Sequence, residues 1–175
     1  MATAPADLEE AIQSLDEKQA SFLQWQGRWA DTARPQQIPP NDFAECGYLA
    51  GRGYGKTRVG AEWLAREVYL DTSGYPSAVI APTYQDIKFT CFEGESGLLS
   101  VIPPELLKAY NKSDMVVEMY TATGDVGAIR GCTAEKPERL RGPQHCRIWA
   151  DELAAWQYDD VWDMAMMGLR LGPQP

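Results

Sequence analysis

Gly51-Arg52-Gly53-Tyr54-Gly55-Lys56-Thr57 is the most informative stretch of this sequence. The apolar run before it, Cys46 to Ala50, predicts a short buried strand, and the pattern from Arg58 to Leu70 predicts a helix. A strand, a glycine-rich turn ending in Gly-Lys-Thr and a helix are together typical of a phosphate-binding loop, or P-loop. The alternative is a plain glycine-rich turn in front of a helix.

Each part of this loop suits an anion. The glycines let successive backbone N–H groups turn toward a phosphate, and the N-terminus of the next helix adds partial positive charge. Lys56 is predicted to reach the β- and γ-phosphates of ATP, and the Thr57 hydroxyl is predicted to bind Mg²⁺. Ala50 stands where this Walker A pattern usually has its first glycine. The predicted nucleotide-binding residues of the loop are Gly51, Arg52, Gly53, Tyr54, Gly55, Lys56 and Thr57.

A second strand candidate, Cys146 to Ala150, leads directly into Asp151 and Glu152. A buried strand of a parallel sheet delivers such carboxylates to the sheet edge where phosphates bind, as in a Walker B motif. Asp151 is the predicted Mg²⁺ ligand, and Glu152 is the predicted general base for the attacking water. The pair could instead cap a helix, but its combination with the P-loop favours ATP hydrolysis.

The rest of the chain supplies further elements. Asp7 to Trp25 is predicted to be an amphipathic helix with an Asp7 cap, serving as a lid, a subunit contact or simple packing. The prolines of Arg34 to Pro40 predict an extended or turned loop. Its Gln37 could present an amide to adenine, or the loop could merely lead into the domain. Other predictions are a strand at 77–81, helices at 85–92 and from 103 to 110, and a hairpin of 115–121 with 126–132.

Composition limits the class of protein. A chain of 175 residues that is 45% hydrophobic can bury one core, and no apolar run is long enough to span a membrane. The net charge of −9 argues against a protein that coats DNA. Four cysteines without a C-x-x-C pair, and a single histidine, His145, leave little for a zinc site, so reduced thiols are expected.

With both halves of the site in place, the sequence resembles the ATPase part of the terminase large subunit of tailed phages, in the branch that includes gene-transfer-agent packaging proteins. The matching segments are R-P-Q-Q-I-P-P at 34–40, A-G-R-G-Y-G-K-T-R at 50–58, G-E-S-G-L-L at 94–99, A-E-K-P-E-R-L-R-G-P-Q-H at 134–145, W-A-D-E-L-A-A-W at 149–156 and G-L-R-L-G-P-Q-P at 168–175. A helicase-like P-loop ATPase would share the loop and the Asp-Glu pair but not R-L-R-G-P-Q.

The resemblance implies an α/β P-loop NTPase of the ASCE type, with a mostly parallel sheet flanked by helices. The predicted domain organisation is an N-terminal helical segment at 1–33 and an ATPase domain at 34–175. In this family a further strand, between the P-loop strand and the Asp-Glu strand, and a nuclease domain follow these segments. We therefore expect an ATPase domain that is incomplete at its C-terminus, without the nuclease domain.

The resemblance also implies a function. ATP and Mg²⁺ would power the movement of double-stranded DNA into procapsids, with the portal protein and the terminase small subunit as partners and a homo-oligomeric ring as the working form. The place of action would be the host cytoplasm, on the procapsid. Arg52 matches a family arginine proposed to act in cis and Arg141 one proposed to act on the neighbouring subunit, with Arg139 a weaker candidate. Arg141 could instead pair with surface carboxylates. The alternative function is a non-catalytic nucleotide-binding remnant.

Overall fold

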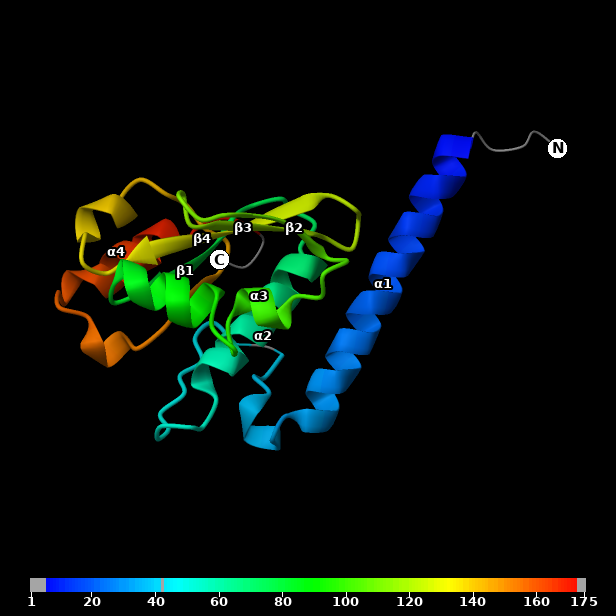
Figure 1. The fold of residues 1–175 in the computed structure, drawn as a ribbon. Helices are drawn as coiled ribbons and strands as arrows, with labels where there is room; N and C mark the ends of the chain where they lie inside the picture. The colour runs from blue at the N-terminus through cyan, green and yellow to red at the C-terminus, as the bar shows by residue number, and fades with distance from the viewer. Residues whose placement is uncertain (1–5, 42, 173–175) are drawn as a thin grey trace.

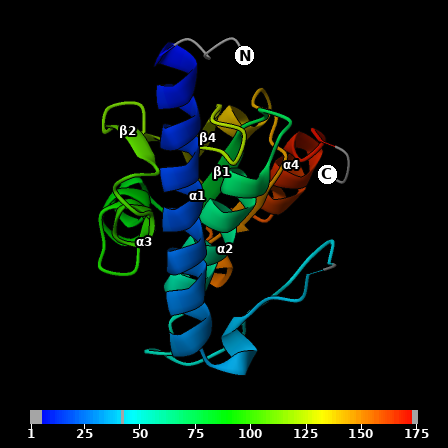
Figure 2. The same ribbon diagram turned by 90° about the vertical axis from the view of Figure 1, so that its right-hand side faces the viewer.

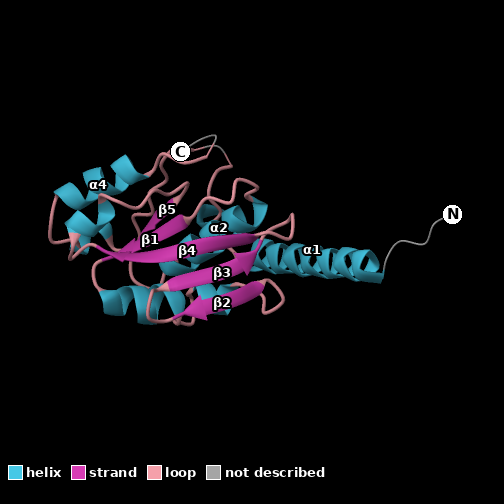
Figure 3. Cartoon of the chain, turned by 90° about the horizontal axis from the view of Figure 1, so that it is seen from above, coloured by secondary structure: helices cyan, strands magenta, loops and turns pink. Residues whose placement is uncertain are grey.

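A five-stranded sheet forms the centre of the molecule, with the strand order β2-β3-β4-β1-β5. The computed structural model describes residues 6–41 and 43–172, with side chains from residue 13 on. The strands are β1 (Ser77–Ala81), β2 (Leu107–Asn111), β3 (Val116–Tyr120), β4 (Val126–Thr133) and β5 (Ile148–Ala150). β1 pairs in parallel with β4 and β5, and β3 pairs antiparallel with β2 and β4. Four strands therefore point one way and β3 the other, and β5 is an edge strand (Figure 3).

Helices lie on both sides of the sheet (Figure 1). The α-helices are α1 (Ala6–Thr32), α2 (Lys56–Leu70), α3 (Leu98–Val101) and α4 (Asp160–Gly168). Shorter segments are the 3-10 turns η1 (Pro35–Gln37), η3 (Pro137–Leu140) and η4 (Leu153–Ala155), and the π-helix η2 (Asp86–Phe92). None of the helices in the described part of the chain has the length and apolar character that a membrane crossing requires.

β1 shows why the layers form. All five of its residues, Ser-Ala-Val-Ile-Ala, are buried, as expected for a parallel strand covered on both faces. Val79 and Ala81 pack into the larger core with α2, η2 and α3, whereas Ile80 packs into a second cluster with α4 and η3. Alternate residues of a strand point to opposite faces, so this division defines a three-layer α/β/α arrangement.

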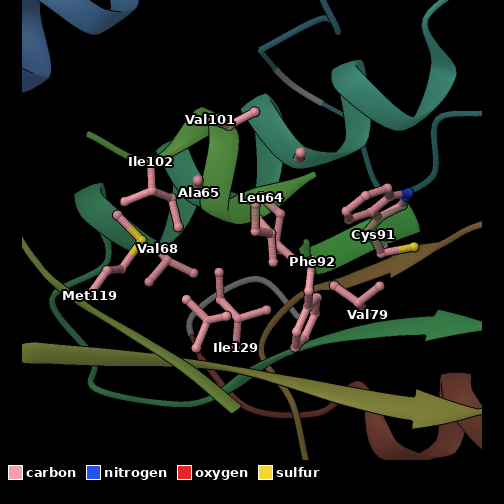
Figure 4. Close-up of a cluster of buried hydrophobic side chains, with 14 of the residues drawn as sticks. Leu64, Ala65, Val68, Val79, Cys91, Phe92, Val101, Ile102, Met119 and Ile129 are labelled. Atoms are coloured by element: carbon pink, nitrogen blue, oxygen red, sulfur yellow. The ribbon is translucent and has the colours of Figure 1, made fainter. Parts of the chain in front are cut away.

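The larger core fills the space between α2 and the sheet (Figure 4). Leu64, Ala65 and Val68 of α2 meet Val79, Met119 and Ile129 of the sheet, with Cys91 and Phe92 contributed by η2. Leu64 is fully buried, and truncating such a leucine to alanine typically costs about 2–5 kcal/mol. This core holds the helix that follows the P-loop firmly on the sheet.

α1 lies along one side of the body (Figure 1). Phe22 stacks on Tyr69 with the ring centroids 3.9 Å apart, and the Trp25 indole donates a 2.6 Å hydrogen bond to Glu62 of α2. The predicted helix is thus confirmed and continues to Thr32, and packing is its visible role. The side chain of the predicted cap, Asp7, lies outside the described side chains.

Several predicted elements are confirmed and two are wrong. The helix at 58–70, the strand at 77–81 and the hairpin at 115–132 are present, and 86–92 is helical with π geometry. The predicted helix at 103–110 is wrong, because residues 107–111 pair with β3 as strand β2. Pro103 and Pro104 end a helix rather than open one, and the β3 edge offers partners for the backbone that follows. The 34–40 loop is a 3-10 turn with proline at its first position.

The second error concerns Cys46 to Ala50, which is not a strand. Leu49 is fully exposed, and Figure 2 shows the segment between η1 and α2 (cyan) running out from the body. A strand forms only where its backbone groups find partners, and β5 is the last strand on that side among the described residues. The P-loop is therefore supported here by its helix and by η1 rather than by a strand.

Candidate nucleotide-binding site

The P-loop has the conformation that its glycines predict. Gly53 and Gly55 have φ values of 79° and 89°, in the left-handed region that glycine adopts most easily. α2 begins at Lys56, so its first N–H groups have no partner within the helix and carry the positive end of its dipole. Lys56 folds back over the loop, with Nζ donating a 2.9 Å hydrogen bond to the Ala50 carbonyl.

Two residues of the Arg34–Gln37 turn bind the P-loop at Tyr54. The Gln37 side chain is 8% exposed, donates through Nε2 to the Tyr54 carbonyl at 2.8 Å and accepts from the Arg34 N–H at 2.9 Å. The Arg34 guanidinium also donates to the Tyr54 carbonyl and lies 4.7 Å from the centroid of its ring. Gln37 therefore contacts the P-loop itself, and its contact with adenine stays a prediction. The contact of Arg34 with Tyr54 was not predicted, because the two residues lie in different segments.

The second half of the predicted site is Asp151, which directly follows strand β5. The Asp151 N–H donates to the Ile80 carbonyl at 2.8 Å, and the side chain is only 6% exposed. Burial raises the pKa of Asp151, while a hydrogen bond from Cys91 and the positive charge of Lys56 lower this pKa. Asp151 is thus a buried carboxylate at the end of β5, the strand on which α2, the helix of the P-loop, packs.

Cys91 is a partner of Asp151 that sequence reasoning missed. Its buried thiol lies 3.6 Å from Asp151 Oδ2, on the π-helix η2. Burial, followed by the nearby charge of Asp151, raises the pKa of the Cys91 thiol, so Cys91 acts as a neutral donor. π-helical turns often mark functional sites, but this one has no distinctive sequence pattern.

Glu152 points elsewhere. Its backbone is left-handed, with φ at 46° and ψ at 46°, and its side chain is exposed. The Trp156 indole donates a 3.1 Å hydrogen bond to the Asp151 carbonyl and so helps to hold this turn. The two neighbouring carboxylates are thus separated, with Asp151 directed inward and Glu152 toward solvent.

Two contacts fasten the P-loop helix to the Asp-Glu strand. Gly60 of α2 packs on Trp149 so closely that a Cβ at Gly60 would lie 2.3 Å from the indole. Arg147, just before β5, pairs with Glu67 at 3.4 Å and Asp71 at 3.2 Å, both near the end of α2. No local pattern predicts these contacts, since each joins segments that are far apart in the chain.

The two predicted arginines occupy different places. Arg52 is exposed on the P-loop. Arg141 is exposed in an open groove of about 420 Å³, which contains no P-loop residue and is lined by Glu135, Pro137, Glu138, Arg141, Tyr158, Asp160 and Met164. Within the described part of the chain, no carboxylate lies within 4.0 Å of either guanidinium. Arg141 therefore does not form the surface ion pair that was its alternative role.

The donor set fits a nucleotide-bound Mg²⁺. Among the residues described, no group of three or more His, Cys, Asp or Glu side chains could hold a metal by itself. Mg²⁺ in proteins is usually held by one or two protein ligands together with waters and phosphate oxygens. Thr57, at the start of α2, and the buried Asp151 could supply such a pair, and their role as Mg²⁺ ligands stays a prediction.

Comparison with known proteins agrees with this geometry. The profile of the family described as "Terminase large subunit, T4likevirus-type, N-terminal" matches residues 48–174. The large terminase ATPase domain of Thermus phage P74-26 is similar in structure, with a TM-score of 0.52 and 20% identity, over 68% of this chain and 52% of that chain. A variant of that domain gives a TM-score of 0.47 at the same identity and coverage. No curated protein matches the sequence significantly.

The structural similarity confirms the predicted α/β P-loop fold, with its sheet flanked by helices. The matched region spans about half of the Thermus phage chain. The family match extends over most of this chain and includes both the P-loop and the Asp-Glu strand. The chain therefore belongs to the terminase large subunit family of the T4-like-virus type, as part of its N-terminal region.

Proposed function

We propose that this chain binds ATP with Mg²⁺ and hydrolyses it, as the motor part of a terminase large subunit that moves double-stranded DNA into procapsids. The observation that most supports this proposal is the packing of α2, which carries Lys56 and Thr57, against β5, which leads into Asp151. This packing fastens the helix that begins with Lys56 and Thr57 to the strand that leads into Asp151. A glycine-rich turn that binds no nucleotide would not need a buried carboxylate at the end of the strand on which its helix packs.

The residues of the site have distinct roles in this proposal. The N–H groups of the loop and of the first turn of α2 bind phosphate oxygens, and Lys56 exchanges the Ala50 carbonyl for the β- and γ-phosphates. Thr57 and Asp151 would hold Mg²⁺, which when bound neutralises phosphate charge and orients the γ-phosphate. Glu152 takes the proton of the attacking water. Arg52 acts within its own site, and Arg141 acts on the site of a neighbouring subunit in a ring.

The wider assignment rests on the family. Double-stranded DNA, the portal protein and the terminase small subunit are the proposed partners, and the procapsid in the host cytoplasm is the proposed place of action. Gln37 is the proposed adenine contact, through the Nε2 hydrogen and the Oε1 lone pair that its bonds to Tyr54 and to the Arg34 N–H leave unused. Guanine has an acceptor, O6, in place of the adenine N6 donor, so exchange of ATP for GTP is expected to weaken binding in the wild type, and this preference is expected to shrink in Gln37→Ala.

A second candidate function is nucleotide binding without turnover. The segment from Cys46 to Ala50, which pairs with no strand among the described residues, favours it, because a P-loop that does not continue from a sheet strand can bind phosphates without holding the geometry of the transition state.

Turnover and binding measurements separate the two candidates. ATP hydrolysis is measured with Mg²⁺, with and without double-stranded DNA, and ATP affinity is measured by titration calorimetry. Lys56→Ala is expected to weaken ATP binding at least tenfold, whereas Glu152→Gln is expected to keep binding and to lose turnover by a factor of about 10²–10⁴. Binding without turnover in the wild type would support the second candidate. If the wild type does not bind ATP, both candidates are wrong.

A further inference from the structure

The P-loop helix and the Asp-Glu strand approach each other closely at Gly60 and Trp149. A Cβ built on Gly60 would lie 2.3 Å from both Cε2 and Nε1 of the Trp149 indole, and 2.7 Å from Cδ2. Side-chain carbons in contact normally stand about 3.5–4.0 Å apart, so only a hydrogen atom fits at position 60. Trp149 is itself 6% exposed and pairs with Val79 of β1.

The contact is placed directly between the two halves of the site. Gly60 lies one turn after Lys56 and Thr57, and residues three or four apart share a face of a helix. Trp149 lies two residues before Asp151, and residues two apart point to the same face of a strand. Trp149 and Cys91, the partner of Asp151, belong to the same core cluster, which confirms that this face looks toward α2 and η2.

We infer that Gly60 and Trp149 are positioning residues, which together set the separation between the P-loop and Asp151. The indole acts as a fixed spacer, and the absence of a side chain at position 60 lets α2 lie directly on it. This inference rests on the proposed function, because its consequence is the correct placement of Thr57 and Asp151 as joint ligands of the nucleotide-bound Mg²⁺. Neither residue touches the nucleotide in this account.

A methyl group at position 60 would have to move α2 away from β5 by roughly 1 Å to restore a normal contact distance. A misplacement of about that size can cost a factor of about 10² in a step that depends on joint alignment. The part of ATP affinity that depends on Mg²⁺ needs both sides of the site, whereas Mg²⁺-free binding needs only the loop. A purely structural role for the contact would instead lower stability and leave the ratio of these affinities unchanged.

The test measures ATP affinity by titration with a fluorescent ATP analogue, in Mg²⁺ and in EDTA, together with the melting temperature of each variant. The Mg²⁺-dependent gain is the ratio of the ATP affinity in Mg²⁺ to the ATP affinity in EDTA. Gly60→Ala is expected to lower this gain at least tenfold, while its ATP affinity in EDTA changes less than threefold. Gly27→Ala is the matched control, because Gly27 is also a helical glycine but an added Cβ there meets no atom within 4 Å. This control is expected to bind like the wild type under both conditions.

A double-mutant cycle provides the second comparison. Trp149→Leu removes the clashing indole atoms, so adding Gly60→Ala to this variant is expected to lower the Mg²⁺-dependent gain less than threefold further. The inference is overturned if Gly60→Ala keeps the Mg²⁺-dependent gain, or if it costs the same factor in both backgrounds. Should Gly60→Ala fail to fold, Trp149→Leu decides: it is expected to lose the gain as well, and a folded variant that keeps it overturns the inference.

The wild-type titration separates this inference from the proposed function. A wild type that binds ATP with a Mg²⁺-dependent gain, alongside a Gly60→Ala variant with the same gain, overturns only the positioning role. A wild type that does not bind ATP, or binds it without any effect of Mg²⁺, overturns the proposed function and the inference together.

Discussion

The hydrogen bond between Trp25 and Glu62 is the best place to measure what fastens α1 to the P-loop helix. Glu62 is 1% exposed, accepts from the Trp25 indole at 2.6 Å and pairs with Arg58 at 2.6 Å. Arg58 directly follows Thr57 of the P-loop. Trp25→Phe keeps an aromatic ring against Phe22 but removes the N–H donor.

The expected loss follows from the type of bond. Hydrogen bonds to charged groups contribute about 1.5–3 kcal/mol, and Glu62 keeps Arg58 as a partner, so we expect a loss of about 2 kcal/mol. For a domain of this size each kcal/mol shifts the melting temperature by about 2–4 °C, so the expected decrease is about 4–8 °C. Trp29→Phe is the matched control, because the Trp29 ring only faces the Arg58 guanidinium at 5.8 Å, and its loss should stay below about 0.5 kcal/mol.

Urea unfolding followed by circular dichroism measures these free energies. A double-mutant cycle with Glu62→Leu, which removes the acceptor, should give a coupling energy of about 1 kcal/mol or more, since the two side chains are in direct contact. Equal losses in Trp25→Phe and Trp29→Phe, or a coupling energy near zero, would refute the reasoning. In that case apolar packing of Phe22 and Trp25 alone would hold α1.

Two further outcomes are expected. Gly55→Ala should weaken ATP binding about tenfold in a fluorescence titration, since the φ of Gly55 is 89° and the new Cβ would lie 2.8 Å from Gln37 Nε2. Gly47→Ala is the control and should bind ATP normally, because a Cβ at Gly47 meets no atom within 4 Å. Equal ATP affinities of the two variants would contradict this prediction. His145 is buried, neither of its ring nitrogens has a hydrogen-bond partner among the described residues, and burial lowers its pKa. The folded state then binds fewer protons, so stability falls as pH drops below about 6.5. Between about pH 7.5 and 5.5 the melting temperature should fall further in the wild type than in His145→Leu, and parallel curves would exclude His145 as the cause.

Elements with strong local patterns were predicted correctly. The helix after the P-loop, the apolar strand at 77–81 and the 115–132 hairpin each carry their periodicity or turn chemistry within a few residues. The strand at 107–111 was missed because its short Leu-Lys-Ala-Tyr-Asn sequence has no pattern stronger than the prolines before it. Cys46 to Ala50 has the composition of a strand, but strand formation depends on a partner elsewhere in the chain.

The same division holds for the site. The glycines at 53 and 55, Lys56, Thr57 and the Asp151-Glu152 pair were recognisable from the sequence, because left-handed turns and phosphate chemistry require particular residue types at particular spacings. Only the tertiary structure shows which side chains support them. Cys91 beside Asp151, Gln37 beneath Tyr54 and Trp149 against Gly60 join segments far apart in the chain. Such contacts depend on how layers pack, and packing is a property of the folded core rather than of any local pattern.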